Sequence, residues 1–286
     1  MGSSARIHST AIIDPKAQLA DDVAVGAYTV IKGLVSIGPG SVVHEHCVIQ
    51  GATVIGRHCK IGPGAYIGTD PQHLRFVHDE AAPSYLVIGD HVIIREAAHL
   101  NRSSRPGLEN ATRIGDHCFI MGAGHVGHDC VLESHVVLAD GSMLGGHCHI
   151  GERAFLGGGC AIHQFVRVGR LCIVSGNEAL SHDVPPFGAA RYGRLKGYNA
   201  VGCRRAGMGR TEIAAIRGVY HRLRNIRATS AVLASIRADL PDLPVVQELV
   251  AFIESSRRGT LSAHRGLRDA SRYGGATVET VENEAP

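Results

Sequence analysis

The stretch that decides the fold is residues 114–150, which read IGDHCFIMGAGHVGHDCVLESHVVLADGSMLGGHCHI. An aliphatic residue stands at every sixth position of this stretch, namely at Ile114, Ile120, Val126, Leu132, Leu138, Leu144 and Ile150. A period of six fits neither an amphipathic helix nor an alternating strand over this length. It is typical of hexapeptide repeats, in which each short strand points one aliphatic side chain inward before the chain turns a corner.

The same period extends through most of the chain. It runs without a miss from Ile7 to Ile67, resumes from Ile88 to Leu100, and continues from Ile114 to Val174. Three such strands make one triangular coil of 18 residues, and successive coils stack about 4.8 Å apart. The composition agrees, because 44% hydrophobic but only 5% aromatic residues suit a core of small aliphatic side chains. We therefore predict a mainly β protein whose residues 1–190 form a parallel β-helix.

Two segments fall out of the repeat. The phase slips between Ile67 and Ile88, and again between Leu100 and Ile114. We expect loops ejected from the β-helix at 68–87 and 101–113. Binding groups tend to lie on such loops.

A second kind of pattern follows the β-helix. The period fades after Leu180, and Pro185-Pro186 forbids another regular strand. Helical spacing then predicts a small C-terminal α-helical domain over 191–258. Its expected inward faces are Ile213, Ile216, Tyr220 and Leu223 after a Thr211 cap, then Val232, Ile236 and Leu240, then Val246, Leu249, Val250 and Ile253 after Pro244. We predict that residues 259–286, which are mostly polar and Gly-rich, form a mobile tail.

Seven of the eight cysteines follow the repeat. Each lies four residues after an aliphatic position: Cys47, Cys59, Cys118, Cys130, Cys148, Cys160 and Cys172. This slot takes a small inward side chain, and cysteine acts there as a small hydrophobe. No CxxC pair occurs, so we expect neither disulfides nor a metal site built on cysteine.

Charge and hydropathy limit the partners and the location. The net charge is +3, but residues 191–258 carry 13 Arg and Lys against 5 Asp and Glu. This surplus is either a set of solvated helix faces or a docking surface for an acidic partner or a phosphorylated substrate. No apolar run of about 18 residues occurs, and Met1 to Arg6 lack the apolar segment of a secretory signal. We expect a cytoplasmic protein with no membrane span and no nucleic-acid partner.

The 18 histidines divide by their place in the repeat. Those three residues after an aliphatic position are expected to be solvated corner residues: His46, His58, His91, His117 and His135, with His147 in the same slot. His128 lies instead two residues after Val126. Since residues 18 apart share a column, His128, Gly146 and Gln164 form one column and Asp129, His147 and Phe165 the next, flanked by His125 and His163. The alternative is chance clustering in a His-rich chain.

This constellation suits acyl transfer. A neutral imidazole at His128 takes the proton of an attacking hydroxyl near neutral pH, while Asp129 or a nearby carbonyl fixes its tautomer. The N–H of Gly146, one coil away, is placed to stabilise the oxyanion. Because no Ser or Cys nucleophile stands beside His128, the pattern favours direct transfer over an acyl-enzyme.

The segment Gly122-Ala-Gly-His125-Val-Gly-His128-Asp129-Cys130 resembles the catalytic segment of acyl-carrier-protein–UDP-N-acetylglucosamine O-acyltransferases, the hexapeptide-repeat acyltransferases of lipid A biosynthesis. The resemblance covers about residues 1–258. It includes Leu144-Gly-Gly146-His147, His163-Gln164-Phe165, Asp183-Val-Pro-Pro186, Gln72-His-Leu-Arg75-Phe76, Arg95-Glu96 with Arg102, and Asn199, Gly202, Arg205 and Gly207.

The resemblance implies a left-handed β-helix and transfer of a (3-hydroxy)acyl chain from acyl carrier protein to the 3-hydroxyl of UDP-N-acetylglucosamine. It makes His128 the general base, with Asp129 beside it and Gly146 at the oxyanion. Substrate-binding positions would be Gln72, His73, Arg75, Asn101, His125, His147, His163, Gln164, Asn199, Arg204 and Arg205, and Gly176 would set acyl length. It further implies a homotrimer with sites between subunits, and no cofactor beyond the carrier's phosphopantetheine.

Four positions depart from the family's pattern: His73, Asn101, Val201 and Ala206. They concern the acceptor more than the chemistry. A related nucleotide-sugar acyl- or acetyltransferase is therefore the alternative, with another acceptor, such as a 3-amino sugar, or another donor.

Rival interpretations are the later N-acyltransferase of the same pathway, a γ-type carbonic anhydrase and a non-catalytic β-helix scaffold. The first carries an extra N-terminal domain, whereas the repeats here begin by Ile7. The second needs three histidines that meet on zinc across an interface.

Overall fold

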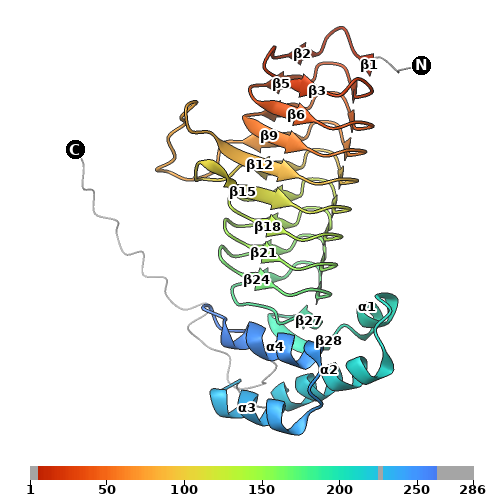
Figure 1. The fold of residues 1–286 in the computed structure, drawn as a ribbon, viewed down its shortest axis with the longest axis vertical. Coiled ribbons are helices and arrows are strands. Elements are labelled where there is room, and N and C mark those ends of the chain that lie inside the picture. Colours follow the sequence, from red (N-terminus) through yellow and green to blue (C-terminus); the bar gives the residue numbers. More distant parts are fainter. Residues whose placement is uncertain (1–5, 225–227, 263–286) are drawn as a thin grey trace, which may run out of the picture.

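The computed structural model describes residues 6–224 and 228–262. Three parallel sheets form the three faces of a prism, with the helices α1–α4 at its C-terminal end (Figure 1). The chain visits the sheets in turn, so strands three apart in sequence are neighbours in one sheet. The sequence predicted this parallel β-helix, and the structure confirms it.

The strands are two to eight residues long. The first sheet holds β1 (Arg6–Ile7), β4 (Ala24–Val25), β7 (Val42–Val43), β10 (Lys60–Ile61), β13 (Ile93–Ile94), β16 (Phe119–Ile120), β19 (Val137–Leu138), β22 (Phe155–Leu156), β25 (Ile173–Val174), β27 (Gly188–Arg191) and β28 (Arg194–Tyr198). The second holds β2 (Ile12–Ile13), β5 (Val30–Lys32), β8 (Val48–Gln50), β11 (Tyr66–Thr69), β14 (His99–Asn101), β17 (His125–Val126), β20 (Met143–Leu144), β23 (Ala161–Ile162) and β26 (Ala179–Leu180). The third holds β3 (Gln18–Leu19), β6 (Val35–Ile37), β9 (Ala52–Ile55), β12 (Ser84–Ile88), β15 (Gly107–Ile114), β18 (Val131–Leu132), β21 (His149–Ile150) and β24 (Arg167–Val168).

The core is the predicted stack of aliphatic side chains. Ile31, Ile49, Ile120 and Leu144 are fully buried, as are the cysteines beside them. The cysteine thiols are free. Burial raises the pKa of Cys118 to about 11, which keeps the thiol protonated and unreactive. The structural interpretation of the cysteines is confirmed.

Close stacking of the coils explains the glycine that often follows the aliphatic residue. A Cβ on Gly115 would lie 2.7 Å from the backbone of Glu133 in the next coil. The third corner residue has a left-handed backbone, for example His117 with φ 57°. Histidine, asparagine and aspartate adopt this region more readily than most residues.

The two excursions from the β-helix are shorter than expected. Residues 70–83 lie between β11 and β12, and residues 102–106 lie between β14 and β15. The predicted loop 101–113 is wrong in its second half, because β15 pairs with β12 from Gly107 to Ile114. Ala111 and Thr112 in this strand are buried but not large and aliphatic. The six-residue aliphatic period therefore does not reveal this strand.

The region after 191 begins with a strand rather than a helix. β28 pairs antiparallel with β27 and closes the end of the prism. The helices α1 (Ala200–Arg205), α2 (Arg210–Leu223), α3 (Ser230–Asp239) and α4 (Pro244–Glu254) follow. α2 is capped by Gly209 and not by Thr211, because the Gly209 N–H donates to Glu212 Oε2 at 2.8 Å. The predicted inward faces are confirmed: Ile216, Tyr220, Leu223, Ile236, Val246, Leu249, Val250 and Ile253 are buried, and Ile213, Val232 and Leu240 pack against the core.

Two arginines of the last coils anchor α4. Arg170 makes a bidentate ion pair with Glu248, with distances of 2.8–3.0 Å. Arg167 donates to the Phe252 carbonyl at 3.0 Å and bonds Asp183 at 3.0 Å. The predicted tail 259–286 begins inside the described part, where the Leu261 N–H donates to the Asp183 carbonyl; residues 263–286 lie outside the described residues.

Candidate active site

The predicted columns lie at the corner between the second and third sheets. β17, β20 and β23 pair in register, with Val126 beside Leu144 and Leu144 beside Ile162. Two residues on, this register aligns His128, Gly146 and Gln164, as predicted from the 18-residue spacing. The His147 N–H donates to the His128 carbonyl at 2.9 Å, which ties the two columns together. We call this turn the histidine–aspartate corner (residues 127–130, 145–148 and 163–166).

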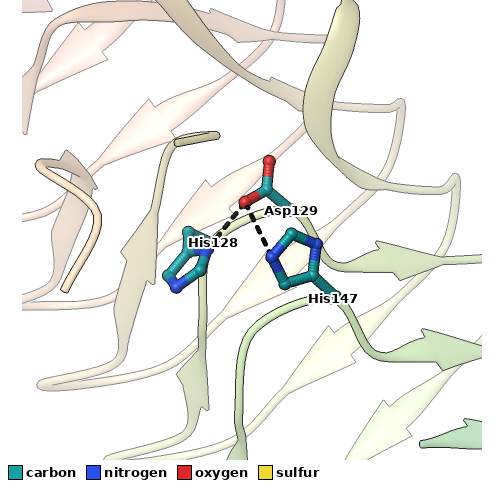
Figure 2. Close-up of side chains that lie close together, drawn as sticks. All are labelled: His128, Asp129 and His147. Carbon is teal, nitrogen blue, oxygen red and sulfur yellow. Dashed lines mark hydrogen bonds and ion pairs between the residues drawn. The ribbon is translucent and has the colours of Figure 1, made fainter. Parts of the chain in front are cut away.

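His128 and Asp129 form the central pair of this corner (Figure 2). The distance between His128 Nδ1 and Asp129 Oδ2 is 2.6 Å. An ionised carboxylate only accepts hydrogen bonds, so Nδ1 carries the proton. The lone pair of His128 Nε2 then remains available to accept a proton from a substrate.

The carboxylate of Asp129 is buried, with 1% of its side chain exposed. Ser103 Oγ donates to Oδ1 and Ser104 Oγ donates to Oδ2, each at 2.6 Å. Burial raises the pKa of Asp129, but the hydrogen bonds from His128, Ser103 and Ser104 together lower it more. The net pKa lies below the ordinary value, so Asp129 is an anion at neutral pH.

His147 completes the cluster from the next coil (Figure 2). Its Nε2 lies 3.5 Å from Asp129 Oδ2, and its ring is perpendicular to that of His128 at 5.2 Å. The His147 ring also stacks on the Phe165 ring, with their centroids 4.5 Å apart. Burial lowers the pKa of His147 from its usual value, although Asp129 opposes this shift.

The ring of His128 is largely covered, with only 11% of the side chain exposed. His73 of the 70–83 segment packs edge-on against it at 5.8 Å, and Gly146 lies on another side. A Cβ on Gly146 would stand 2.6 Å from His128 Cε1. Glycine is therefore needed at 146 to leave room for the imidazole.

The backbone N–H of Gly146 is a further hydrogen-bond donor at this corner. Its carbonyl accepts from the Phe165 N–H at 3.0 Å. Within residues 6–224 and 228–262 its own N–H donates to no other group of the protein. The N–H is thus available to a substrate oxygen, beside the imidazole.

His125 lies on the outer face of β17, one strand along from His99 on β14. The two rings are 5.1 Å apart. Burial, helped by the charges of His99 and His128, lowers the pKa of His125 to about 4. His125 is therefore neutral at physiological pH and can act as a hydrogen-bonding group but not as a cation.

Asn101, two residues after His99 in β14, is fully buried. Its Nδ2 donates to Thr69 Oγ1 at 2.9 Å and to the Asp70 carbonyl at 2.7 Å. Thr69 Oγ1 also lies 2.6 Å from His99 Nε2. Within this chain Asn101 holds the start of the 70–83 segment.

The remaining predicted residues divide into two groups. Gln72, Arg75, His163 and Gln164 are exposed near the corner or on the 70–83 segment. Asn199, Arg204 and Arg205 lie on or beside α1, at the end of the prism (Figure 1). Asn199 caps this helix and donates to the Leu171 carbonyl. Gly176 lies at a different corner, between β25 and β26. Within one chain, neither Gly176 nor the residues on or beside α1 are brought to His128.

His128, Asp129 and His147 are also the one group of three potential metal ligands in the described part of the chain, with ligand atoms within 4.8 Å of one another. The 2.6 Å contact between His128 Nδ1 and Asp129 Oδ2 has the length of a charge-assisted hydrogen bond. Two serine hydroxyls occupy further lone pairs of the carboxylate. The donor set suits an oriented base rather than an ion.

Sequence reasoning missed three residues of this site: Ser103, Ser104 and Thr112. Thr112 Oγ1 accepts from the Asp129 N–H at 2.8 Å. The only signal in the sequence was the phase slip after Leu100, which marked the segment but not its partner.

Comparison with known proteins identifies the relatives of this chain. A family model described as UDP-N-acetylglucosamine O-acyltransferase, domain 2, matches residues 183–261, and one for bacterial transferase hexapeptide repeats matches residues 34–69. The acyl-[acyl-carrier-protein]–UDP-N-acetylglucosamine O-acyltransferase of Syntrophobacter fumaroxidans is 38% identical over 90% of this chain and 99% of its own length. That of Sinorhizobium fredii is 37% identical over 92% and 98%.

Solved structures similar to this chain come from the same family. The UDP-N-acetylglucosamine O-acyltransferase of Moraxella catarrhalis superimposes with a TM-score of 0.82 at 33% identity, over 89% of this chain and 99% of that one. The Arabidopsis UDP-N-acetylglucosamine acyltransferase gives 0.73 at 26%, over 91% and 99%. The β-helix is left-handed, as the resemblance implied. With this fold, these repeats and relatives that match over nearly their whole length, the chain belongs to the acyl-[acyl-carrier-protein]–UDP-N-acetylglucosamine O-acyltransferase family.

Proposed function

We propose that this protein transfers a (3-hydroxy)acyl chain from acyl carrier protein to the 3-hydroxyl of UDP-N-acetylglucosamine, the first step of lipid A biosynthesis. The observation that carries the proposal is the His128–Asp129 pair. Its 2.6 Å hydrogen bond fixes the tautomer whose Nε2 accepts a proton. The pair lies in a segment that matches relatives named for this activity.

The chemistry follows from this tautomer. His128 Nε2 takes the proton of the sugar hydroxyl while the oxygen attacks the thioester carbonyl carbon. The negative charge that develops on the carbonyl oxygen is stabilised by the free N–H of Gly146. The C–S bond then breaks, and the imidazolium returns its proton to the departing phosphopantetheine thiolate. Asp129 stabilises the imidazolium in between, and the step needs no cofactor beyond the carrier-bound thioester.

Substrate placement is divided between near and distant residues. His125, His147, His163, Gln164, Gln72, His73, Arg75 and Asn101 surround or support the corner and are proposed to hold the sugar and the acyl chain. Asn199, Arg204, Arg205 and Gly176 lie away from His128 within one chain. We propose that a neighbouring subunit of a homotrimer supplies such groups, with the site between subunits.

Exposed apolar side chains on the prism support this assembly. Ile93, Phe155 and Ile173 face outward on three strands of the first sheet, with 37–39% of each residue exposed. Met143 on the second sheet and Phe165 at the histidine–aspartate corner are about half exposed. Exposed apolar groups gathered on one molecule mark contact surfaces. Light scattering of the purified protein should give three times the chain mass.

Acyl carrier protein is the proposed acidic partner of the C-terminal domain. Part of the positive charge there is already neutralised, because Arg222 pairs with Asp239 and Arg237 with Glu254. The exposed Arg217 and Arg224 of the α2 region are better candidates for docking. Replacing both with glutamate should weaken turnover with carrier-bound donor, and the loss should shrink at high salt.

No helix in the described part of the chain is long and apolar enough to cross a membrane. We propose a cytoplasmic location, which the free cysteines support because disulfides are rare in reducing compartments.

The test of the proposed function is direct. The purified protein is mixed with UDP-N-acetylglucosamine or its 3-amino analogue and with a panel of acyl carrier protein thioesters or acetyl-CoA, and the product is analysed by mass spectrometry. A 3-O-acylated nucleotide sugar is expected. Transfer only to a 3-amino analogue, or only from acetyl-CoA, would replace the proposal with the alternative acceptor or donor.

A further inference from the structure

We propose that Ser103 and Ser104 are positioning residues of the reaction, which hold the Asp129 carboxylate as the acceptor for His128 Nδ1. This inference rests on the proposed function of His128 as the base. Neither serine reaches His128 itself. They act through Asp129.

Both serine hydroxyls donate to the Asp129 carboxylate, because an ionised carboxylate only accepts hydrogen bonds. Ser103 is fully buried, and its Oγ accepts from the Arg105 N–H at 3.0 Å. Its own hydrogen is therefore free to point at Asp129 Oδ1, 2.6 Å away. Ser104 Oγ lies 2.6 Å from Oδ2, the same oxygen that accepts from His128. With one hydroxyl on each oxygen, the carboxylate cannot rotate away from the imidazole.

Backbone contacts complete the support. The Ser104 N–H lies 3.2 Å from Oδ1 and 3.4 Å from Oδ2. On the main-chain side, the Asp129 N–H donates to Thr112 Oγ1. Asp129 has φ 59°, a left-handed conformation in which aspartate is tolerated. The 102–106 segment and β15 thus hold the residue from two sides.

The two hydroxyls also tune the charge of the pair. They spread the negative charge of Asp129, and their hydrogen bonds contribute to its lowered pKa. Without them, the carboxylate would attract the proton of the imidazolium more strongly. The acid limb of the pH–activity profile should therefore move when the hydroxyls are removed.

Other titratable and charged groups face the pair from several elements. They are His147 in the next coil, His73 on the 70–83 segment, Arg105 beside the serines and His125 on β17. None of these side chains is removed when only the serines are changed. A shift in the pH profile of serine variants therefore reports on Asp129.

The experiment compares Ser103→Ala, Ser104→Ala and the double variant with the wild type. We expect kcat of the double variant to fall about tenfold or more, with KM changed less than about twofold. The acid limb of kcat/KM should move to higher pH. Ser104→Thr should keep wild-type kinetics, because Ser104 is partly exposed and threonine retains the hydroxyl.

Ser41→Ala is the matched control. Ser41 is also fully buried, donates to the Gly56 carbonyl at 2.9 Å and accepts from the Cys59 N–H at 2.9 Å. It should lower Tm like Ser103→Ala but leave kcat and its pH profile unchanged. A double serine variant that behaves like Ser41→Ala in both respects would reduce the serines to structural residues and overturn the proposal.

A measurement without substrate separates this proposal from the proposed function. In protein labelled with 15N-histidine, the His128 signals are assigned by their loss in His128→Ala. The wild type should show neutral His128 protonated at Nδ1, and the double serine variant should show a mixture of tautomers. An unchanged tautomer contradicts the positioning role, whatever the wild type transfers. Absence of acyl transfer by the wild type would instead contradict the proposed function.

Discussion

Two corners of the same prism carry histidines, and they are built differently. At the corner between the third and first sheets, His58, His91, His117 and His135 recur once per coil and stack with ring centroids 4.8–5.1 Å apart. We call this the ladder corner. At the histidine–aspartate corner, His128 and His147 meet at 88° instead, because Asp129 lies between them.

The difference shows that a repeat position alone does not define a role. His147 occupies the same slot as the ladder histidines, with φ 61° against 53–61° for the four of them. Its neighbours are Asp129 and Phe165 rather than other imidazoles. The two corners differ because, at the histidine–aspartate corner, the neighbouring column and the 102–106 segment place side chains of other types beside this slot.

The sharpest test of the comparison replaces one histidine at each corner. His128→Ala should lower kcat by about 10² to 10⁴, the usual loss when a general base is removed. Its stability should change by less than about 2 kcal/mol, because no aliphatic core residue is touched. His117→Ala is the control and should keep wild-type kcat. Alanine is tolerated at this backbone slot, since Ala97 and Ala123 already occupy it. A His128→Ala variant that retains more than about a tenth of kcat would contradict the mechanism.

The second test crowds the His128 ring without removing it. In Gly146→Ala the new methyl would lie 2.6 Å from His128 Cε1, so the ring must move. We expect kcat to fall about tenfold to a hundredfold, the cost of a displacement near 1 Å. Gly122→Ala is the control in the coil of His128 but at another corner. There the methyl meets the ends of two side chains, Asp140 at 2.9 Å and Glu96 at 3.5 Å. Equal losses in the two variants would show that the effect is general strain on the coil.

The sequence predicted the columns of this site because a strict period determines register. Residues 18 apart must be neighbours once the coils stack, so the spacing alone pairs Asp129 with His147. The cover over His128 could not be predicted in this way. His73, Ser103 and Ser104 lie on segments outside the period, and only tertiary folding brings them to the corner. β15 could not be predicted for a related reason, because its buried residues Ala111 and Thr112 break the aliphatic pattern.

A smaller effect concerns pH and stability. Burial lowers the pKa of His125 to about 4, below its usual 6.5. As the pH falls from about 6.5 towards 4, the unfolded chain takes up a proton that the folded state refuses, so stability falls. In His125→Gln this loss disappears, and Tm should drop less between about pH 6.5 and about pH 4 than in the wild type. Thermal unfolding at the two pH values measures it. A variant whose Tm falls as steeply as that of the wild type would mean that His125 is not buried as described.

The smallest effect is expected at the ladder corner. In His117→Asn the new residue is compatible with the left-handed backbone, as Asn177 shows in the same kind of slot with φ 58°. Two stacked contacts are lost, with His91 at 4.8 Å and His135 at 4.9 Å. Because His91 and His117 are exposed and His135 is half-buried, each contact should contribute about 0.5 kcal/mol, the low end for aromatic pairs.

Tm should therefore fall by only about 2–4 °C, with kcat unchanged. In the double variant with His91→Asn, the contact between the two residues is lost only once. The combined loss should therefore be smaller than the sum of the single losses. A change in kcat beyond about twofold would mean that the ladder communicates with the histidine–aspartate corner through the shared coil. The two corners would then be one functional unit, because the coil that carries His117 also carries His128.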